Sequence, residues 1–217
     1  MTSSRDRVRT RVEYLIGAVS FTAFVVLGIM VRTGPASVDQ ALHEAAGTWW
    51  RDDFGEAAAV LSAVLGPPLP SLLGGGLIVA TVVFRRRSDP RAWVTFRVLV
   101  LLGACRITSA LAKPVFNRER PLEHGDLSYP SGHVASVTST GFAAVVLCLW
   151  LAPRLVVVVR VVTVLLTVLI CAARVTLEVH WLTDTVGSIL AVVGVGFLLT
   201  PALRLSPPRP QHVVSSS

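Results

Sequence analysis

Six long apolar segments constrain the fold of this chain more than any other feature. They cover residues 14–31, 69–84, 92–112, 134–151, 155–173 and 182–203. A helix needs about 20 apolar residues to cross a bilayer, and somewhat shorter runs also suffice. The pattern therefore predicts an all-α fold, an integral membrane helical bundle with six transmembrane helices.

The composition agrees with a membrane protein. Of the 217 residues, 53% are hydrophobic and only 15% are charged, whereas soluble domains carry about a quarter charged residues. The net charge of +7 comes with few aromatic residues and no basic–aromatic stripe for stacking bases, so we expect no nucleic-acid partner. Three cysteines, each inside an apolar segment, form neither a metal-ligand spacing nor a disulfide framework.

The segment after the first apolar run needs a different interpretation. Its apolar part, residues 54–65, is too short to cross a bilayer and stops at Gly66-Pro67-Pro68. We expect residues 37–65 to form interfacial or re-entrant helices, with Trp49 and Trp50 in the headgroup layer. A cleaved signal peptide is the competing reading of the N-terminus. Its apolar part would be unusually long and no clear cleavage site follows, so we expect a retained span.

The arginines give an orientation. They gather before the first segment, between the second and third, between the fourth and fifth, and after the sixth: Arg5, Arg7, Arg9, Arg11, Arg85, Arg86, Arg87, Arg91, Arg154, Arg204 and Arg209. With six spans all of them fall on one face, which the positive-inside rule makes cytoplasmic. We therefore expect a cytoplasmic tail (1–12), a six-span domain (13–204) and a disordered C-terminal tail (205–217).

The opposite face carries a group of polar residues that begins the fourth segment, Pro130-Ser131-Gly132-His133. Pro130 ends any preceding regular structure, and Ser131 is a favourable N-cap for the helix that follows. The amides of Gly132 and His133 would then be unpaired donors at the positive end of a helix, which is a potential anion site. A capped helix with an interfacial histidine fits this motif equally well.

A second pair on this face is His180 and Asp184, four positions apart and hence on one side of a helix. A carboxylate can accept from one imidazole nitrogen and direct the lone pair of the other toward a substrate. An ordinary interfacial pair, or a metal site completed by His133, are alternatives. The cations on the same face, Lys113, Arg120 and Arg174, disfavour a divalent metal and favour a phosphate dianion.

Three motifs in this order resemble the signatures of the type 2 phosphatidic acid phosphatase family: Lys113-x6-Arg120-Pro121, Pro130-Ser131-Gly132-His133 and Arg174-x5-His180-x3-Asp184. That family also includes bacterial lipid phosphatases and, more distantly, vanadium haloperoxidases and soluble acid phosphatases. The motifs span residues 113–184, and the six-span layout extends the likeness to most of the chain. One departure is Ala173, where the family often has Ser before the arginine.

The resemblance implies a role for each motif residue and no metal or other cofactor. His180 would be the nucleophile that forms a phosphohistidine, Asp184 would orient it, and His133 would be the general acid and then the base. The residues that would hold the phosphoryl oxygens are Lys113, Arg120, Ser131, Gly132 and Arg174. Phosphoryl transfer asks mainly for such positioning and charge stabilisation.

The other charged residues near the motifs are less informative. Arg106 lies seven positions before Lys113, on the same helix face, and either supports the site from behind or pairs structurally. Four residues of the loop between the motifs are expected to be mostly solvated: Arg118, Glu119, His124 and Asp126. The glycine run 74–76 is expected to permit close helix packing.

Together these features predict a metal-independent lipid phosphatase of a bacterial plasma membrane, with both termini cytoplasmic and an extracytoplasmic site. We expect a polyprenyl diphosphate as substrate, with phosphatidic acid or phosphatidylglycerol phosphate as alternatives. A flippase would need charges along a path through the membrane, whereas those here gather at one face. A non-catalytic lipid-binding protein would not need His133, His180 and Asp184.

Overall fold

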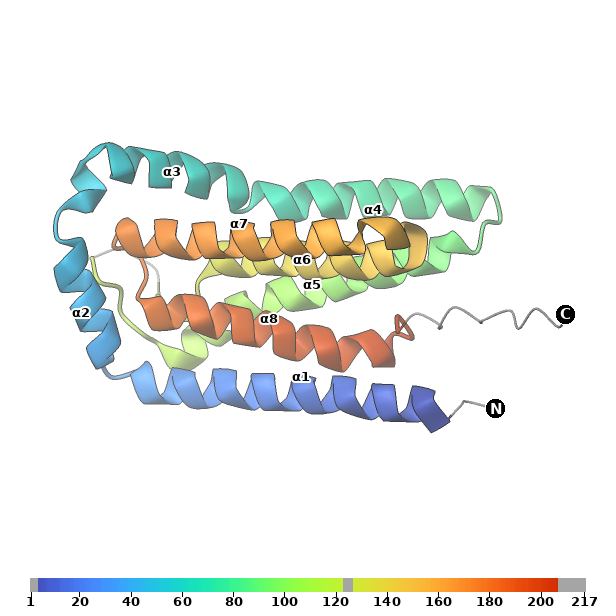
Figure 1. The fold of residues 1–217 in the computed structure, drawn as a ribbon, viewed down its shortest axis with the longest axis horizontal. Helices are drawn as coiled ribbons and strands as arrows, with labels where there is room; N and C mark the ends of the chain where they lie inside the picture. Colours follow the sequence, from blue (N-terminus) through green and yellow to red (C-terminus); the bar gives the residue numbers. More distant parts are fainter. Residues whose placement is uncertain (1–3, 123–126, 207–217) are drawn as a thin grey trace, which may run out of the picture.

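The computed structural model describes residues 4–122 and 127–206, and the regular secondary structure of this part of the chain is helical, without strands (Figure 1). The helices, in chain order, are α1 (Ser4–Val31), α2 (Ser37–Ala46), α3 (Asp53–Leu65), α4 (Pro68–Arg86), α5 (Arg91–Phe116), α6 (Gly132–Leu151), α7 (Val156–Thr176) and α8 (Leu182–Ala202), with short 3₁₀ turns at Trp49–Arg51 and Pro153–Leu155.

Six helical segments are long and apolar enough to cross a membrane: Asp6–Val31, Asp53–Arg86, Arg91–Phe116, Gly132–Leu151, Pro153–Thr176 and Leu182–Ala202. This agrees with the predicted six-span bundle. Figure 1 shows the long helices side by side along the bundle, whereas α2 crosses one end of it between α1 and α3. The predicted interfacial helix after the first span is therefore present in α2.

The second span differs from the prediction. Residues 54–65 do not lie across the end of the bundle, because α3 runs in line with α4 (Figure 1) and the two together form the 34-residue segment Asp53–Arg86. Helix α3 ends at Gly66, whose N–H donates to the Ser62 carbonyl at 3.0 Å. Proline is tolerated at the first helical position, so Pro68 begins a new helix at once instead of ending the span.

Packing within the bundle is tightest between α1 and α8, which run antiparallel. A Cβ added at Gly17 would lie 2.8 Å from the backbone nitrogen of Leu198, and one at Gly194 would lie 2.8 Å from that of Phe21. Small residues permit such a close backbone approach between membrane helices. On the outside of α7, Val157, Val161 and their neighbours are exposed, as expected for a lipid-facing surface.

The two ends of the bundle carry different connections. The described termini and the α4–α5 and α6–α7 turns, where the arginines gather, lie at one end, and the α7–α8 connection lies at the other (Figure 1). Helix α1 already begins at Ser4, so most of the expected 1–12 tail is helical. Most of the expected 205–217 tail lies outside the described residues, but Leu205 is buried and its carbonyl accepts from the Trp150 indole at 2.7 Å.

Candidate active site

The predicted motifs lie at the end of the bundle away from the described termini. Helix α5 ends there with Lys113 in its last turn, α6 begins there at Gly132, and α7 and α8 are joined there by residues 177–181. The start of α6 is bonded to the start of α8, because the Ser131 N–H donates to the Asp184 carbonyl at 3.3 Å. Motifs that are far apart in the sequence thus converge on one small region.

His180 and Asp184 contact each other, but not on one face of a helix as the spacing suggested. His180 precedes Trp181, the N-cap of α8, and Asp184 is the third residue of that helix. The Oδ2 atom of Asp184 accepts the Trp181 N–H at 2.8 Å and lies 3.4 Å from His180 Nδ1. The helix cap therefore fixes the carboxylate beside the imidazole, which is only 2% exposed.

The surroundings of His180 favour its neutral form. Burial, together with the nearby Arg120 and Arg174 guanidinium groups, lowers the pKa of His180 to about 4, although its contact with Asp184 acts in the opposite direction. The Ser128 hydroxyl lies 3.5 Å from Nδ1 and also donates to Asp184 Oδ2. The Nδ1 side of the ring is thus occupied, so the other nitrogen, Nε2, is the one left for chemistry.

The Pro130–His133 segment supplies potential donors to an anion. Ser131 is the N-cap residue of α6, as predicted, but its side chain makes no capping hydrogen bond. Its hydroxyl is buried and, among the described residues, has no hydrogen-bond partner. A buried polar atom without a partner is costly, which points to a ligand that completes it. The first-turn amides of α6 lie directly beside this hydroxyl.

His133 is half-buried and lies against the joint between α3 and α4. A Cβ added at Gly66 would lie 2.4 Å from the Cδ2 atom of the His133 ring. Behind it, the Arg106 guanidinium donates to the Gly132 carbonyl at 3.1 Å. Of the two interpretations of Arg106, the structure thus favours the one in which Arg106 supports the site, because it holds the Gly132 carbonyl.

The three predicted phosphate-binding cations approach from different elements. Lys113 donates to the Leu127 carbonyl, and Arg120 donates to the Val179 carbonyl at 3.0 Å. Arg174 donates to the Ser62 hydroxyl on α3 at 2.8 Å, while its buried Nε has no hydrogen-bond partner within the described chain. Arg120 and Arg174 lie close enough to His180 to affect its pKa. All eight predicted site residues therefore belong to one end of the bundle.

Sequence reasoning missed two charged residues of this region. Arg118, expected to be solvated, is only 2% exposed and donates to Asp184 Oδ1 at 2.6 Å and to Asp39 Oδ2 at 2.8 Å. Asp39, on α2, was assigned no role. The adjacent Glu119 is exposed, as expected, whereas His124 and Asp126 lie outside the described residues. Polar loop composition cannot reveal a buried charge whose partners lie 66 and 79 positions away.

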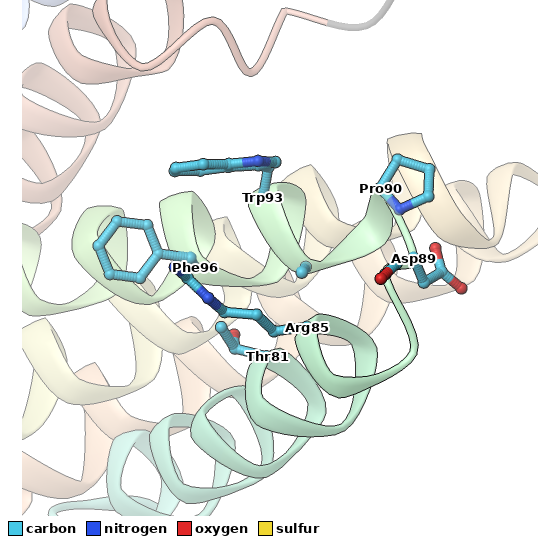
Figure 2. A pocket seen from close by; sticks show the side chains of 8 residues that line it. Thr81, Arg85, Asp89, Pro90, Trp93 and Phe96 are labelled. Carbon is cyan, nitrogen blue, oxygen red and sulfur yellow. The ribbon is translucent and has the colours of Figure 1, made fainter.

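One cavity lies away from this region, and a second borders it. One of about 540 Å³ is formed at the α4–α5 turn, at the end that carries the described termini; Figure 2 shows Arg85, Trp93 and Phe96 around it. A smaller cavity of about 270 Å³ lies between α4 and α5 and reaches Arg106. Of the glycine run, Gly74 borders it and is buried against α5, where an added Cβ would lie 3.9 Å from Leu99 and Leu102. A Cβ added at Gly75 or Gly76 would meet no described atom within 4 Å, so close packing is limited to Gly74.

Within the described ranges 4–122 and 127–206, no group of three or more His, Cys, Asp or Glu side chains is arranged to hold a metal ion. A metal site built from His133, His180 and Asp184, the alternative considered above, thus gains no support from the geometry.

Comparisons with known proteins show the family and the fold. The family model described as the PAP2 superfamily matches residues 94–206, which is 113 of the 217 residues. A solved structure, described as the first transmembrane PAP2 type phosphatidylglycerolphosphate phosphatase from Bacillus subtilis, superimposes with a TM-score of 0.67. It is 20% identical in sequence, and the match covers 86% of this chain and 95% of that one. Among curated proteins, no sequence gave a significant match.

Proposed function

Because this chain belongs to the PAP2 superfamily, we propose that it removes phosphate from a membrane lipid through a phosphohistidine formed on His180. Family membership and the likeness to a membrane phosphatase support a hydrolase of phosphate esters with six membrane-crossing helices. The observation that carries the proposed mechanism is the contact of His180 Nδ1 with Asp184 at 3.4 Å inside a cluster of cations.

The proposed reaction has two steps. In the first, Nε2 of His180 attacks phosphorus, the bond to the leaving oxygen breaks, and His133 gives that oxygen a proton. In the second, His133 takes a proton from water, whose oxygen attacks the phosphohistidine and releases inorganic phosphate and neutral His180. Asp184 stabilises the positive charge that His180 carries between the steps, as an oriented carboxylate does for a catalytic imidazole.

The phosphoryl oxygens would be held by two kinds of donor. Lys113, Arg120 and Arg174 supply charge, and the Ser131 hydroxyl and the Gly132 amide supply short neutral contacts at the start of α6. The unpartnered Ser131 Oγ and Arg174 Nε atoms support this assignment, because a phosphate could satisfy both. Preorganised donors of this kind provide most of the stabilisation that phosphoryl transfer needs.

For the substrate, we propose a lipid whose phosphate reaches the site at the extracytoplasmic face while its chains stay between the helices. The arginine-rich connections at the other end support this orientation, and the cavity between α4 and α5 that reaches Arg106 offers space beside the site. A polyprenyl diphosphate remains our first candidate. The likeness to a phosphatidylglycerolphosphate phosphatase favours phosphatidylglycerol phosphate as the second, ahead of phosphatidic acid.

The test is phosphate release by purified protein in detergent from these three lipids, each assayed with EDTA present. We expect release without added metal, and a loss of at least about 10⁴-fold in His180→Ala, the size that removal of a nucleophile gives in other hydrolases. Arg51→Gln, an exposed residue at the same end, is the matched control and should keep full activity. Activity lost with EDTA would overturn metal independence, and an active His180→Ala protein would overturn the nucleophile.

The same assay separates the other protein classes. A flippase would move a labelled lipid phosphate across vesicles without releasing phosphate. A non-catalytic binding protein would retain the lipid and release nothing, with equal retention by the wild type and His180→Ala. Phosphate release from any of the three lipids excludes a non-catalytic binding protein.

A further inference from the structure

A buried guanidinium links the carboxylate beside His180 to the helix that crosses the end of the bundle. The Arg118 side chain is 2% exposed, and its two terminal nitrogens contact different carboxylates. One nitrogen donates to Asp184 Oδ1 at 2.6 Å and to the Thr183 hydroxyl at 2.7 Å. The other donates to Asp39 Oδ2 at 2.8 Å. Asp184 and Asp39 therefore each have an ionic partner, although both carboxylates are buried.

The end of α5 directs Arg118 into this position. Asn117 has a left-handed backbone (φ 46°, ψ 45°), and its N–H donates to the Lys113 carbonyl at 3.0 Å. Asparagine tolerates this conformation better than most residues, so it ends the helix and turns the chain inward. The Arg118 carbonyl then accepts the Ser128 N–H at 2.8 Å, which holds Ser128 beside Asp184 and His180.

The position of the Asp39 carboxylate is also fixed by several hydrogen bonds. Its Oδ1 atom accepts the Thr183 N–H at 3.0 Å, and its Oδ2 atom accepts the Thr183 hydroxyl at 2.7 Å and the Ala36 N–H at 3.1 Å. The carboxylate thus holds the first turn of α8 and the start of α2 together. Thr183 and Asp184, which are neighbours on α8, are fixed by the same Arg118–Asp39 pair.

The charges explain what this arrangement can do. Two carboxylates surround one guanidinium, so the group as a whole carries one negative charge, and Asp184 directs its other oxygen, Oδ2, to His180. A buried charge without a partner costs several kcal/mol, so the contact with Arg118 stabilises the ionised form of Asp184. Asp39 shares the positive charge of Arg118, and Asp184 therefore keeps part of its negative charge for His180. Both the position and the effective charge of the Asp184 carboxylate therefore depend on Arg118 and Asp39.

We propose that Arg118 and Asp39 are positioning residues for the nucleophile, acting on His180 through Asp184. This inference rests on the proposed function of His180 and goes beyond it, because neither residue touches the phosphoryl group. Their removal should lower kcat and leave KM nearly unchanged, since the ground-state contacts to the phosphate stay in place.

The test compares Arg118→Gln, which removes the guanidinium group, and the isosteric Asp39→Asn by kcat, KM and the pH dependence of kcat/KM. We expect kcat to fall about 10- to 100-fold in each, as when a partner that orients a catalytic group is removed. The groups that face His180 are Asp184, Ser128, Arg120 and Arg174, all unchanged in both variants. Any shift of the acid limb therefore reports the altered charge around Asp184.

The two variants should shift this limb in opposite directions. Without Arg118, the full charge of Asp184 acts on His180, which then keeps its proton to a higher pH, by about one unit. Without the Asp39 charge, Arg118 acts on Asp184 alone and the limb moves to a lower pH. Arg118→Lys, which keeps the charge but only one of the two contacts, should recover part of the lost kcat.

The control for a merely structural role is His43→Gln. His43 also ties α2 to the α7–α8 connection, through a 3.3 Å contact with Glu178, but it does not contact Asp184. It should keep wild-type kcat and pH dependence. Equal losses in His43→Gln and Asp39→Asn, or shifts of the same sign in Arg118→Gln and Asp39→Asn, would overturn the inference.

The inference and the proposed function can fail separately. If the wild type releases phosphate and His180→Ala does not, while Arg118→Gln and Asp39→Asn keep wild-type kcat, the inference alone is wrong. If His180→Ala stays active, the proposed nucleophile is wrong. Should Arg118→Gln not fold, as a lost melting transition would show, Asp39→Asn and its shift to lower pH decide the question, because asparagine has the size of aspartate and keeps one acceptor oxygen for the Thr183 N–H.

Discussion

Lys113 is the only lysine of the chain, and it lies half-buried in the last turn of α5 at the end of the bundle where the motifs meet. Its ammonium donates to the Leu127 carbonyl. All basic residues at the other end of the bundle are arginines, so the lysine stands where a compact cation on a flexible stem has a chemical use. Residue type and position support the proposed contact of Lys113 with the phosphate.

Lys113→Arg should keep the charge and still lower kcat, by about 10-fold or more, because a planar guanidinium cannot reproduce the contacts of an ammonium. The measurement is phosphate release at saturating lipid. Arg32→Lys, an exposed cation at the same end, makes the reverse exchange and should have no effect. Full activity of Lys113→Arg would show that only the charge matters at this position.

His180 gives a prediction for stability against pH. Its pKa in the folded protein, about 4, lies below the ordinary value of 6.5, so the folded state binds the proton less tightly than the unfolded state does. The contribution of neutral His180 to stability is therefore complete above pH 6.5 and is lost as the pH falls from 6.5 to 4.

The melting temperature of the wild type should thus fall more between about pH 7 and about pH 5 than that of His180→Gln, which cannot take up a proton there. The groups around the ring, Asp184, Ser128, Arg120 and Arg174, are the same in both proteins. Equal decreases would mean that His180 is not held in its neutral form.

The meeting of the eight proposed site residues at one end of the bundle could be predicted from the sequence, because the number of spans places all of their segments on one face. Arg118 and Asp39 could not. Each lies in a polar stretch beside a helix end, and only the meeting of α2, α5 and α8 makes them buried partners. The Asn117 turn gave a local signal that α5 ends there, but not the direction in which the next side chain points.

At the scale of elements, the joint between α3 and α4 connects the fold to the chemistry. It places Ser62 on Arg174 and the Gly66 backbone against the His133 ring, although neither contact was predicted. The run of 54–65 was too short to be read as a span, and Gly66-Pro67-Pro68 was read as its end. Because the break falls between two helices in line, the site gains contacts that a straight helix would not provide.

Gly66→Ala should therefore lower turnover by about 10-fold or more. The new methyl group would lie 2.4 Å from the His133 ring and 2.7 Å from the Ser62 carbonyl, so the His133 side chain, our proposed general acid, and the joint must both shift. Gly75→Ala, on α4 with nothing within 4 Å, is the control and should stay within about twofold of the wild type. Equal activities of the two variants would show that the joint between α3 and α4 does not affect turnover.

At the scale of the whole molecule, the number of spans was predictable because apolar length alone decides which helices can cross a bilayer. With six spans, the arginine-rich connections fall at one end of the bundle and the motifs at the other, so this arrangement was also predictable. The close contact of α1 with α8 was not predictable, since the two helices are separated by most of the chain and small residues occur in many segments.

The orientation can be tested with an impermeant thiol reagent on intact cells. Gly34→Cys, exposed at the end that carries the motifs, should react, whereas Arg87→Cys, exposed at the arginine-rich end, should react only after lysis. The native cysteines are buried or half-buried and serve as the background in the unmodified protein. The reverse pattern would place the site in the cytoplasm.

The most direct test of the account is to trap the phosphorylated protein. Rapid quenching of the wild type with a ³²P-labelled lipid phosphate, followed by peptide mapping, should reveal an acid-labile, base-stable phosphoryl group on His180. His133→Ala should slow both its formation and its hydrolysis, because both steps use that imidazole, whereas His180→Ala should carry none. A wild type that turns over lipid without ever carrying phosphate on His180, or that carries it on another residue, would contradict the mechanism.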